Sequence, residues 1–209
     1  MMTPRVRHAA LTAHITSSVG WFGAVVAFLA LSIAGLTSGN RELIRAAYIA
    51  MELVGWFVIV PFCLATLATG LVQSLGTNWG LFRHNWVVAK LAIAVIATIL
   101  LTLHMRPVGY VANLAAGTSL SHSDLRQVRM QLVVDAALAI VALTIATILS
   151  VYKPQGLTRY GRRVSGVTVA VGEVRPWSYA WAIAALLLVL LFTFVHLAGF
   201  ALQGHGHGH

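Results

Sequence analysis

The chain has 209 residues, of which 59% are hydrophobic and only 9% are charged, and its formal net charge at neutral pH is +9. A soluble domain carries about 25% charged residues, so this composition excludes a water-soluble globular protein of this size. The basic residues lie between long apolar stretches and form no groove with stacking aromatics. This favours anionic lipid headgroups over nucleic acid as the partner of the positive charge.

Five stretches are long and apolar enough to cross a bilayer as helices. A spanning helix needs about 20 apolar residues, and backbone groups in lipid must be satisfied internally, which favours helices. We therefore predict an all-α, polytopic transmembrane bundle that forms a single domain. The expected spans are residues 9–36, 46–72, 86–105, 132–152 and 179–202.

Two of these stretches have features of their own. The first follows Arg5 and Arg7, as the apolar core of a signal peptide would, but it is about twice as long as such a core. We therefore predict that it is a retained helix. Pro61, near the middle of the second stretch, cannot donate a hydrogen bond to the carbonyl of Phe57, and we expect a kink there.

The basic residues of the connections predict the orientation, because cytoplasmic loops carry an excess of Lys and Arg. The segment 153–178 is a basic loop, and its arginines suit a leaflet rich in anionic lipid. We expect a plasma-membrane protein with a cytoplasmic N-terminus and an outside C-terminus. The N-terminal side carries Arg5, Arg7, Arg83, Lys90, Lys153, Arg159, Arg162, Arg163 and Arg175, and the other side carries Arg41, Arg45, Arg106, Arg126 and Arg129.

Four ionisable side chains from four different spans fall at one depth. They are Glu52, His104, Asp135 and His196, and helix rise places them roughly 8–13 Å outward of the membrane midplane. Ionisable residues within spans are costly and mark functional sites by default. We therefore predict that these side chains point into the bundle and that at least three of them converge.

Such a cluster is compatible with several roles. Imidazoles from facing helices can ligate haem iron, His and carboxylate together can hold a divalent metal, and both groups can relay protons. The alternative is a structural role, in which Glu52 and Asp135 pair with His or Arg106 and join the helices.

A second pair, His14 and Lys90, lies toward the other membrane face. Lys90 is long enough to snorkel to the interface, whereas His14 is short. Lys90, Ala97 and His104 are spaced seven residues apart, so they lie close to one seam of the third span. A basic pocket at His14 and Lys90 would suit a ligand that carries carboxylates, such as a porphyrin.

The segment 203–209 is a His-rich tail in which His205, His207 and His209 alternate with Gly. Unprotonated imidazoles on a flexible tail can collect a transition metal at neutral pH. The alternative is a polar chain end without a role.

Parts of the chain resemble a known group of membrane proteins. The segment 14–23, with its His followed by Trp-Phe-Gly, resembles the first helix of HemJ-type protoporphyrinogen oxidases. Trp86 and Lys90, with His104 at the end of the same helix, resemble their Lys-bearing helix, and CopD-type copper-resistance proteins are distantly similar. The stretch 149–156 is similar to uncharacterised actinobacterial membrane proteins.

This resemblance implies a helical bundle that binds b-type haem, with His14 a candidate axial ligand and Lys90 close to the haem. Glu52, Asp135, His196 and the tail are not part of that pattern. The expected function is therefore haem binding for electron transfer or haem handling, as a component of a membrane oxidoreductase whose catalytic residues are not identified.

Two alternatives stay open. In the first, the chain is a copper- or zinc-handling protein, in which the tail gathers metal and the four-residue level receives it. In the second, it is an accessory subunit without chemistry, packed against a partner in a membrane complex or against a second copy of itself.

Overall fold

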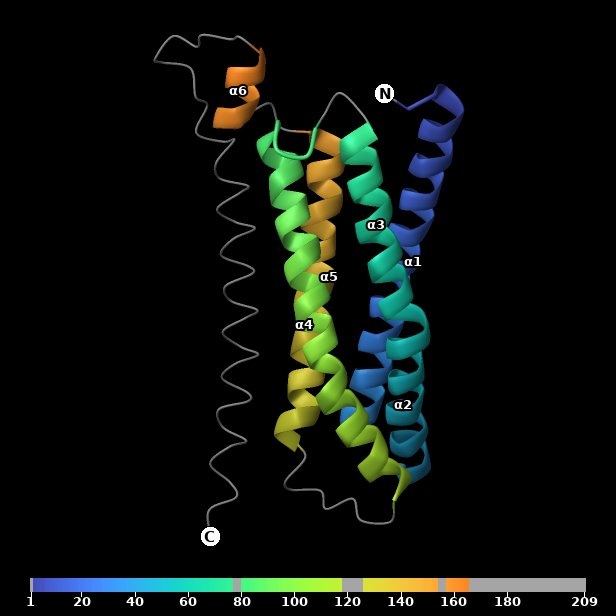
Figure 1. Cartoon of the computed structure of the whole chain (residues 1–209). Coiled ribbons are helices and arrows are strands. Elements are labelled where there is room, and N and C mark those ends of the chain that lie inside the picture. The colour runs from blue at the N-terminus through green and yellow to red at the C-terminus, as the bar shows by residue number, and fades with distance from the viewer. Residues whose placement is uncertain (1, 77–79, 118–125, 154–156, 166–209) are drawn as a thin grey trace.

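The computed structural model describes residues 2–76, 80–117, 126–153 and 157–165. Regular structure in these ranges is helical, apart from an isolated bridge between His84 and Leu157. Figure 1 shows long helices that run side by side, with a short one near the end that carries the N-terminus. The elements are α1 (Pro4–Thr37), α2 (Arg41–Val54), η1 (Gly55–Ile59), α3 (Val60–Gly76), α4 (Asn85–Ala116), α5 (Arg126–Tyr152) and α6 (Arg159–Ser165).

Four helical segments of the described chain are long and apolar enough to cross a membrane. They are Pro4–Thr37, Arg41–Gly76, Asn85–Ala116 and Arg126–Tyr152. This confirms the all-α class and the first four expected spans. The fifth expected span, 179–202, lies outside the described residues, as do residues 166–178 of the basic loop.

All four described spans extend beyond the limits expected from the sequence, most clearly α4. Helix α4 continues to Ala116 although Arg106 and Pro107 follow its most apolar part, and α5 begins at Arg126. The extension of α4 keeps a buried face, with Val108 and Val111 almost fully enclosed. Packing on a neighbouring helix therefore continues the helix past the point where apolar composition alone would end it.

The connection between α1 and α2 is short and capped. The side chain of Asn40 accepts hydrogen bonds from the backbone N–H groups of Glu42 and Leu43, at 2.9 and 3.4 Å. Asn is a preferred N-cap because its oxygen satisfies donors that the first helical turn leaves unpaired. This cap starts α2 directly after α1 ends and sets the two helices antiparallel.

The second span departs from α geometry next to its proline. Gly55–Ile59 forms a π-helical turn, in which the backbone N–H of Val60 bonds the carbonyl of Gly55. Pro61 follows within one turn, so the irregularity lies beside the expected position and takes the form of a widened turn. Such π-bulges replace the regular bonding pattern locally without ending the helix.

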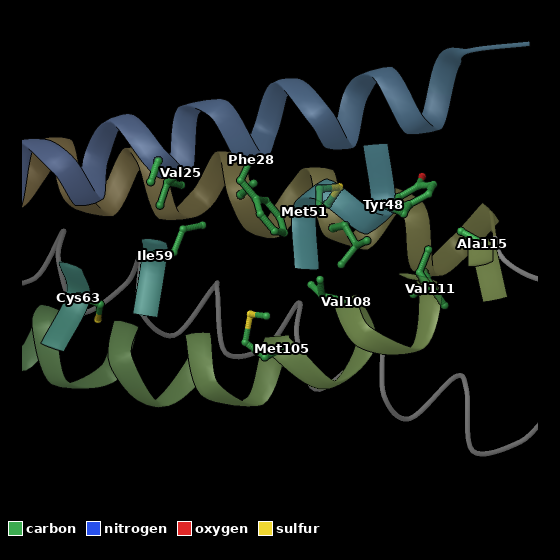
Figure 2. Packing of buried hydrophobic residues seen from close by; sticks show 14 of the residues in the cluster. Val25, Phe28, Tyr48, Met51, Ile59, Cys63, Met105, Val108, Val111 and Ala115 are labelled. Atoms are coloured by element: carbon green, nitrogen blue, oxygen red, sulfur yellow. The ribbon is translucent and has the colours of Figure 1, made fainter. Parts of the chain in front are cut away.

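The main core lies where α1, α2, α4 and α5 meet. Figure 2 shows Phe28 of α1, Met51 of α2 and Met105 of α4 among its buried side chains. A smaller cluster around Ile93 and Leu149 joins α4 to α5 elsewhere along the bundle. The outward faces carry exposed apolar side chains such as Phe57, which suits a surface covered by lipid.

Candidate functional site

His104 and Asp135 form a buried pair between α4 and α5. The Nδ1 atom of His104 lies 3.0 Å from Oδ2 of Asp135, and the two side chains are 9% and 2% exposed. The ring of Phe28 from α1 lies 6.0 Å from the imidazole, centre to centre. Three helices thus position this histidine, and the equal depth expected for His104 and Asp135 brings them into contact.

The position of the carboxylate decides which ring nitrogen of His104 can act as a ligand. In the tautomer with the proton on Nδ1, the ring presents that N–H to the carboxylate oxygen and its lone pair lies on Nε2. A histidine oriented by a carboxylate in this way is the common arrangement of metal-ligating imidazoles. The pair therefore has the donor chemistry of a metal or haem ligand.

The pair lies at one end of an apolar cavity with a volume of about 80 Å³. Residues Ile93 to Met105 of α4 line it, which corresponds to a length of roughly 18 Å by helix rise. The lining is almost entirely apolar, and the polar atoms of His104 and Asp135 are exceptions. The other walls include Trp21, Phe28, Ile96, Leu100, Ala139 and Leu143.

Glu52 faces a different part of the bundle. Its Oε1 atom lies 3.2 Å from the point that a Cβ on Gly109 would occupy, so the carboxylate lies against α4 beside that glycine. The described residues contain no group of three His, Cys, Asp or Glu side chains placed to hold a metal ion. Of the four residues expected at one level, the structure therefore brings His104 and Asp135 together and places Glu52 apart from them. The fourth, His196, lies outside the described residues.

His14 is held at the crossing of α1 and α3. Its Nδ1 atom lies 3.1 Å from the hydroxyl oxygen of Thr69, and this hydroxyl donates to the carbonyl of Ala65 at 2.6 Å. The hydroxyl oxygen therefore accepts from the N–H of His14. A Cβ on Gly70 would lie 3.2 Å from the ring, so the glycine gives the imidazole its space. This geometry joins two helices.

Lys90 lies near His14 but not at the cavity. Its Nζ atom is 5.9 Å from the centre of the Trp86 ring, a cation–π distance, and its charge lies within electrostatic range of His14. Ala97 and His104 line the cavity, whereas Lys90 is not part of its lining. The two expected constellations are thus separate sites at opposite ends of the bundle.

One buried cation was not expected from the sequence. Arg129 of α5, assigned to a connection, is 8% exposed. Its Nε donates to the hydroxyl of Tyr48 at 2.7 Å, and another guanidinium nitrogen donates to the carbonyl of Gly35. A Cβ on Gly35 would lie only 2.7 Å from the Tyr48 ring. Arg129 therefore ties together α1, α2 and α5, and only the glycine and tyrosine near the ends of their spans could have indicated it.

Several expected site residues lie outside the described part of the chain. These are His196 and the tail histidines His205, His207 and His209. Their roles as ligands stay predictions.

Comparisons with protein families, with curated proteins and with solved structures find no match for this chain. The resemblance to HemJ-type and CopD-type proteins has no support from them. The findings describe an all-α membrane protein with four candidate spans in its described part.

Proposed function

We propose that this chain is a membrane-embedded protein that binds a b-type haem through His104 and transfers electrons or handles haem. One observation supports this proposal above the others. A buried imidazole, oriented by the carboxylate of Asp135, lies at the end of an apolar cavity with aromatic walls. When bound, haem iron supplies one-electron redox chemistry, and the apolar surroundings control its potential.

The donor set at the site fits an iron ligand. Nε2 of His104 is the atom that would bind the metal, and Asp135 would keep the ring in the required tautomer and orientation. Trp21 and Phe28 supply aromatic walls of the kind that pack against a planar ring system. His14 would not share this iron, because it lies at the α1–α3 crossing and bonds Thr69.

The cavity is smaller than a haem, so the helices around it must move before a haem can bind. Pockets that enclose organic ligands have volumes of roughly 300–1,000 Å³, whereas this cavity measures about 80 Å³. A haem therefore enters only if α1 separates from α4 and α5. Along the almost entirely apolar lining this separation removes van der Waals contacts, and it must leave intact, or break, the bond from Arg129 of α5 to the Gly35 carbonyl of α1.

The test is the visible absorption spectrum of the full chain, purified in detergent from haem-replete cells. We expect a Soret band and pyridine-extractable haem in the native chain, and loss of both in His104→Ala. His8→Ala is the matched control, because His8 is exposed in the first turns of α1. A native chain without haem, or a His104→Ala variant that retains it, would overturn the proposal.

The small cavity favours one second candidate, a copper or zinc site. A single metal ion needs no more space than the cavity offers, and His104 and Asp135 supply two donors of suitable type. Further donors would come from His196 and from the tail. Elemental analysis of the same preparation distinguishes the candidates, because copper or zinc without porphyrin supports this one. A chain with neither would favour an accessory subunit in a membrane complex.

We further propose that the N-terminus is cytoplasmic and that anionic lipids contact the basic end. The support is the distribution of Lys and Arg, since arginines cluster at the end that carries the N-terminus and α6. Accessibility of single cysteines introduced at positions 7 and 39, in a Cys63→Ser background, tests the orientation. Labelling of position 7 from outside intact cells would reverse it.

A further inference from the structure

Thr158, which precedes α6, attaches that helix to the connection between α3 and α4 by hydrogen bonds. The backbone N–H of Thr158 donates to the carbonyl of Arg83 at 3.0 Å, and the Thr158 hydroxyl donates to the carbonyl of Phe82. The same hydroxyl accepts from the N–H of Gly161 at 3.0 Å, within the first turn of α6. One threonine therefore both starts α6 and attaches it to a distant part of the chain.

Gly161 makes this attachment close. Its residue is buried, and a Cβ at this position would collide with the carbonyl oxygen of Arg83. The same point lies 3.1 Å from Cγ of Arg83, so the side chain of Arg83 runs alongside α6. The arginines of α6 are thus carried on a backbone that rests directly on the α3–α4 connection and next to Arg83.

The end of the bundle that carries α6 is strongly basic. The described carboxylates, Glu42, Glu52 and Asp135, belong to the opposite half of the molecule, in α2 and in the first turns of α5. The described part of this end holds cations and no carboxylate. Those cations are Arg5, Arg7, Arg83, Lys90, Lys153, Arg159, Arg162 and Arg163.

Exposed aromatic side chains at this end are of the kind found at the level of lipid headgroups. Phe82, Tyr152 and Tyr160 belong to the segments at this end, and they are 56%, 78% and 61% exposed. Tyr is enriched at membrane–water interfaces, because its ring is apolar and its hydroxyl is polar. Aromatic side chains beside the arginines of α6 are therefore consistent with a position near phospholipid phosphates.

We propose that α6, docked on the α3–α4 connection, forms with Arg83 a binding site for the headgroup of an anionic phospholipid. Arg162 and Arg163 hold the phosphate, for which the planar guanidinium is well suited. A topology signal needs only positive charge in a connection. Here backbone contacts at Thr158 and Gly161 hold the segment that carries the arginines in one position, as a binding site requires. This inference rests on the proposed contact of the basic end with anionic lipids, and it is independent of the proposed haem function.

The test compares lipid retention by the full chain in nanodiscs that contain phosphatidylglycerol and phosphatidylcholine. Native mass spectrometry after detergent release counts the bound lipids. We expect Arg162→Gln with Arg163→Gln to weaken retention of phosphatidylglycerol by roughly tenfold or more, since each cation near a surface contributes about fivefold. Arg5→Gln with Arg7→Gln is the control, because it removes the same charge at the same end from exposed positions of α1.

Gly161→Val separates geometry from charge. It alters no charge but forces α6 away from the Arg83 carbonyl, and we expect the same direction of loss. If thermal unfolding shows that this variant does not fold, Thr158→Val removes the hydroxyl contacts more gently and replaces it. If the Arg162/Arg163 and Arg5/Arg7 double variants lose the same amount of bound phosphatidylglycerol, the attraction is one of bulk charge and the site is overturned. Unchanged retention in the geometric variant would equally overturn the site.

Discussion

Two histidines of the described bundle, the half-buried His14 and the buried His104, lie at helix crossings of different chemistry. His14 meets a hydroxyl on α3, between two helices packed closely enough that Gly70 faces the imidazole. His104 meets a carboxylate on α5 and lies at the wall of a cavity. Both are single histidines on apolar helices, and composition alone ranks them as equal candidates.

The difference between them lies in the partner and in the space. A threonine that donates its own hydrogen to a carbonyl can only accept from the ring, so the His14–Thr69 contact is complete as a helix-to-helix bond. A carboxylate is a charged acceptor that orients the ring and strengthens its donor nitrogen. The adjoining cavity has room for a metal ion, and a haem requires α1 to separate from α4 and α5. We therefore interpret the α1–α3 crossing as structural and the α4–α5 crossing as the functional candidate.

The largest effect should come from Asp135→Ala. The change leaves the buried imidazole of His104 without its carboxylate partner, and we expect the free energy of unfolding to fall by about 2 kcal/mol. Titration with a denaturing detergent from mixed micelles measures it. Asp135→Asn retains an acceptor oxygen at similar volume and should lose clearly less. A loss below about 1 kcal/mol in the alanine variant would make the two crossings alike.

Thr69→Val should cost less, because it removes a neutral acceptor. Hydrogen bonds between membrane helices contribute about 0.6 kcal/mol on average and about 1.7 at most, and we expect a loss in that range. The same titration measures it, and Thr102→Val, at an exposed hydroxyl of α4, is the control. Loss of the haem spectrum in Thr69→Val would assign the ligand role to this crossing instead.

Gly70→Ala and Gly109→Ala form a matched pair. In each, the new Cβ would lie 3.2 Å from a side-chain atom, Cε1 of His14 in one and Oε1 of Glu52 in the other. The ring is held by Thr69, whereas the carboxylate is the tip of a flexible chain. We expect Gly70→Ala to be the less stable variant by about 1 kcal/mol, although both gain helix propensity. Equal stabilities would show that the His14 ring is free to move.

The smallest effect should come from Cys63→Ser at the α3–α4 crossing. The Thr98 hydroxyl donates to the carbonyl of Ala94, so the thiol of Cys63 donates to its oxygen at 3.1 Å. A serine hydroxyl can replace this donor, and we expect a change within about 0.5 kcal/mol. Thermal unfolding in detergent measures it. A larger loss would mean that the thiol contributes packing rather than a hydrogen bond.

Apolar length predicted the positions of the four described spans, because lipid demands it of each helix separately. It placed the end of α4 too early, since Val108 and Val111 are held by neighbouring packing rather than by lipid. Apolar length also placed the start of α5 too late, so Arg129 was assigned to a connection. Its acceptors belong to α1 and α2, which no property of α5 alone reveals.

Depth along the helices correctly brought His104 and Asp135 together but did not bring Glu52 to them. Depth gives the level of a residue and not the direction in which it faces. Gly109, which Glu52 contacts, follows His104 by five residues, a turn of about 140° around α4. A side chain at the right level can therefore occupy another groove of the bundle.

The extra residue in the π turn at Gly55–Ile59 compensates for the proline of the second span. A proline inside a regular α-helix clashes with the carbonyl four residues earlier, and the widened turn ahead of Pro61 gives that ring room. Deleting one residue from the turn would restore regular winding and return the clash. Replacing the proline alone would leave a surplus residue. The two irregularities compensate each other, so this span tolerates their joint loss better than the loss of either one.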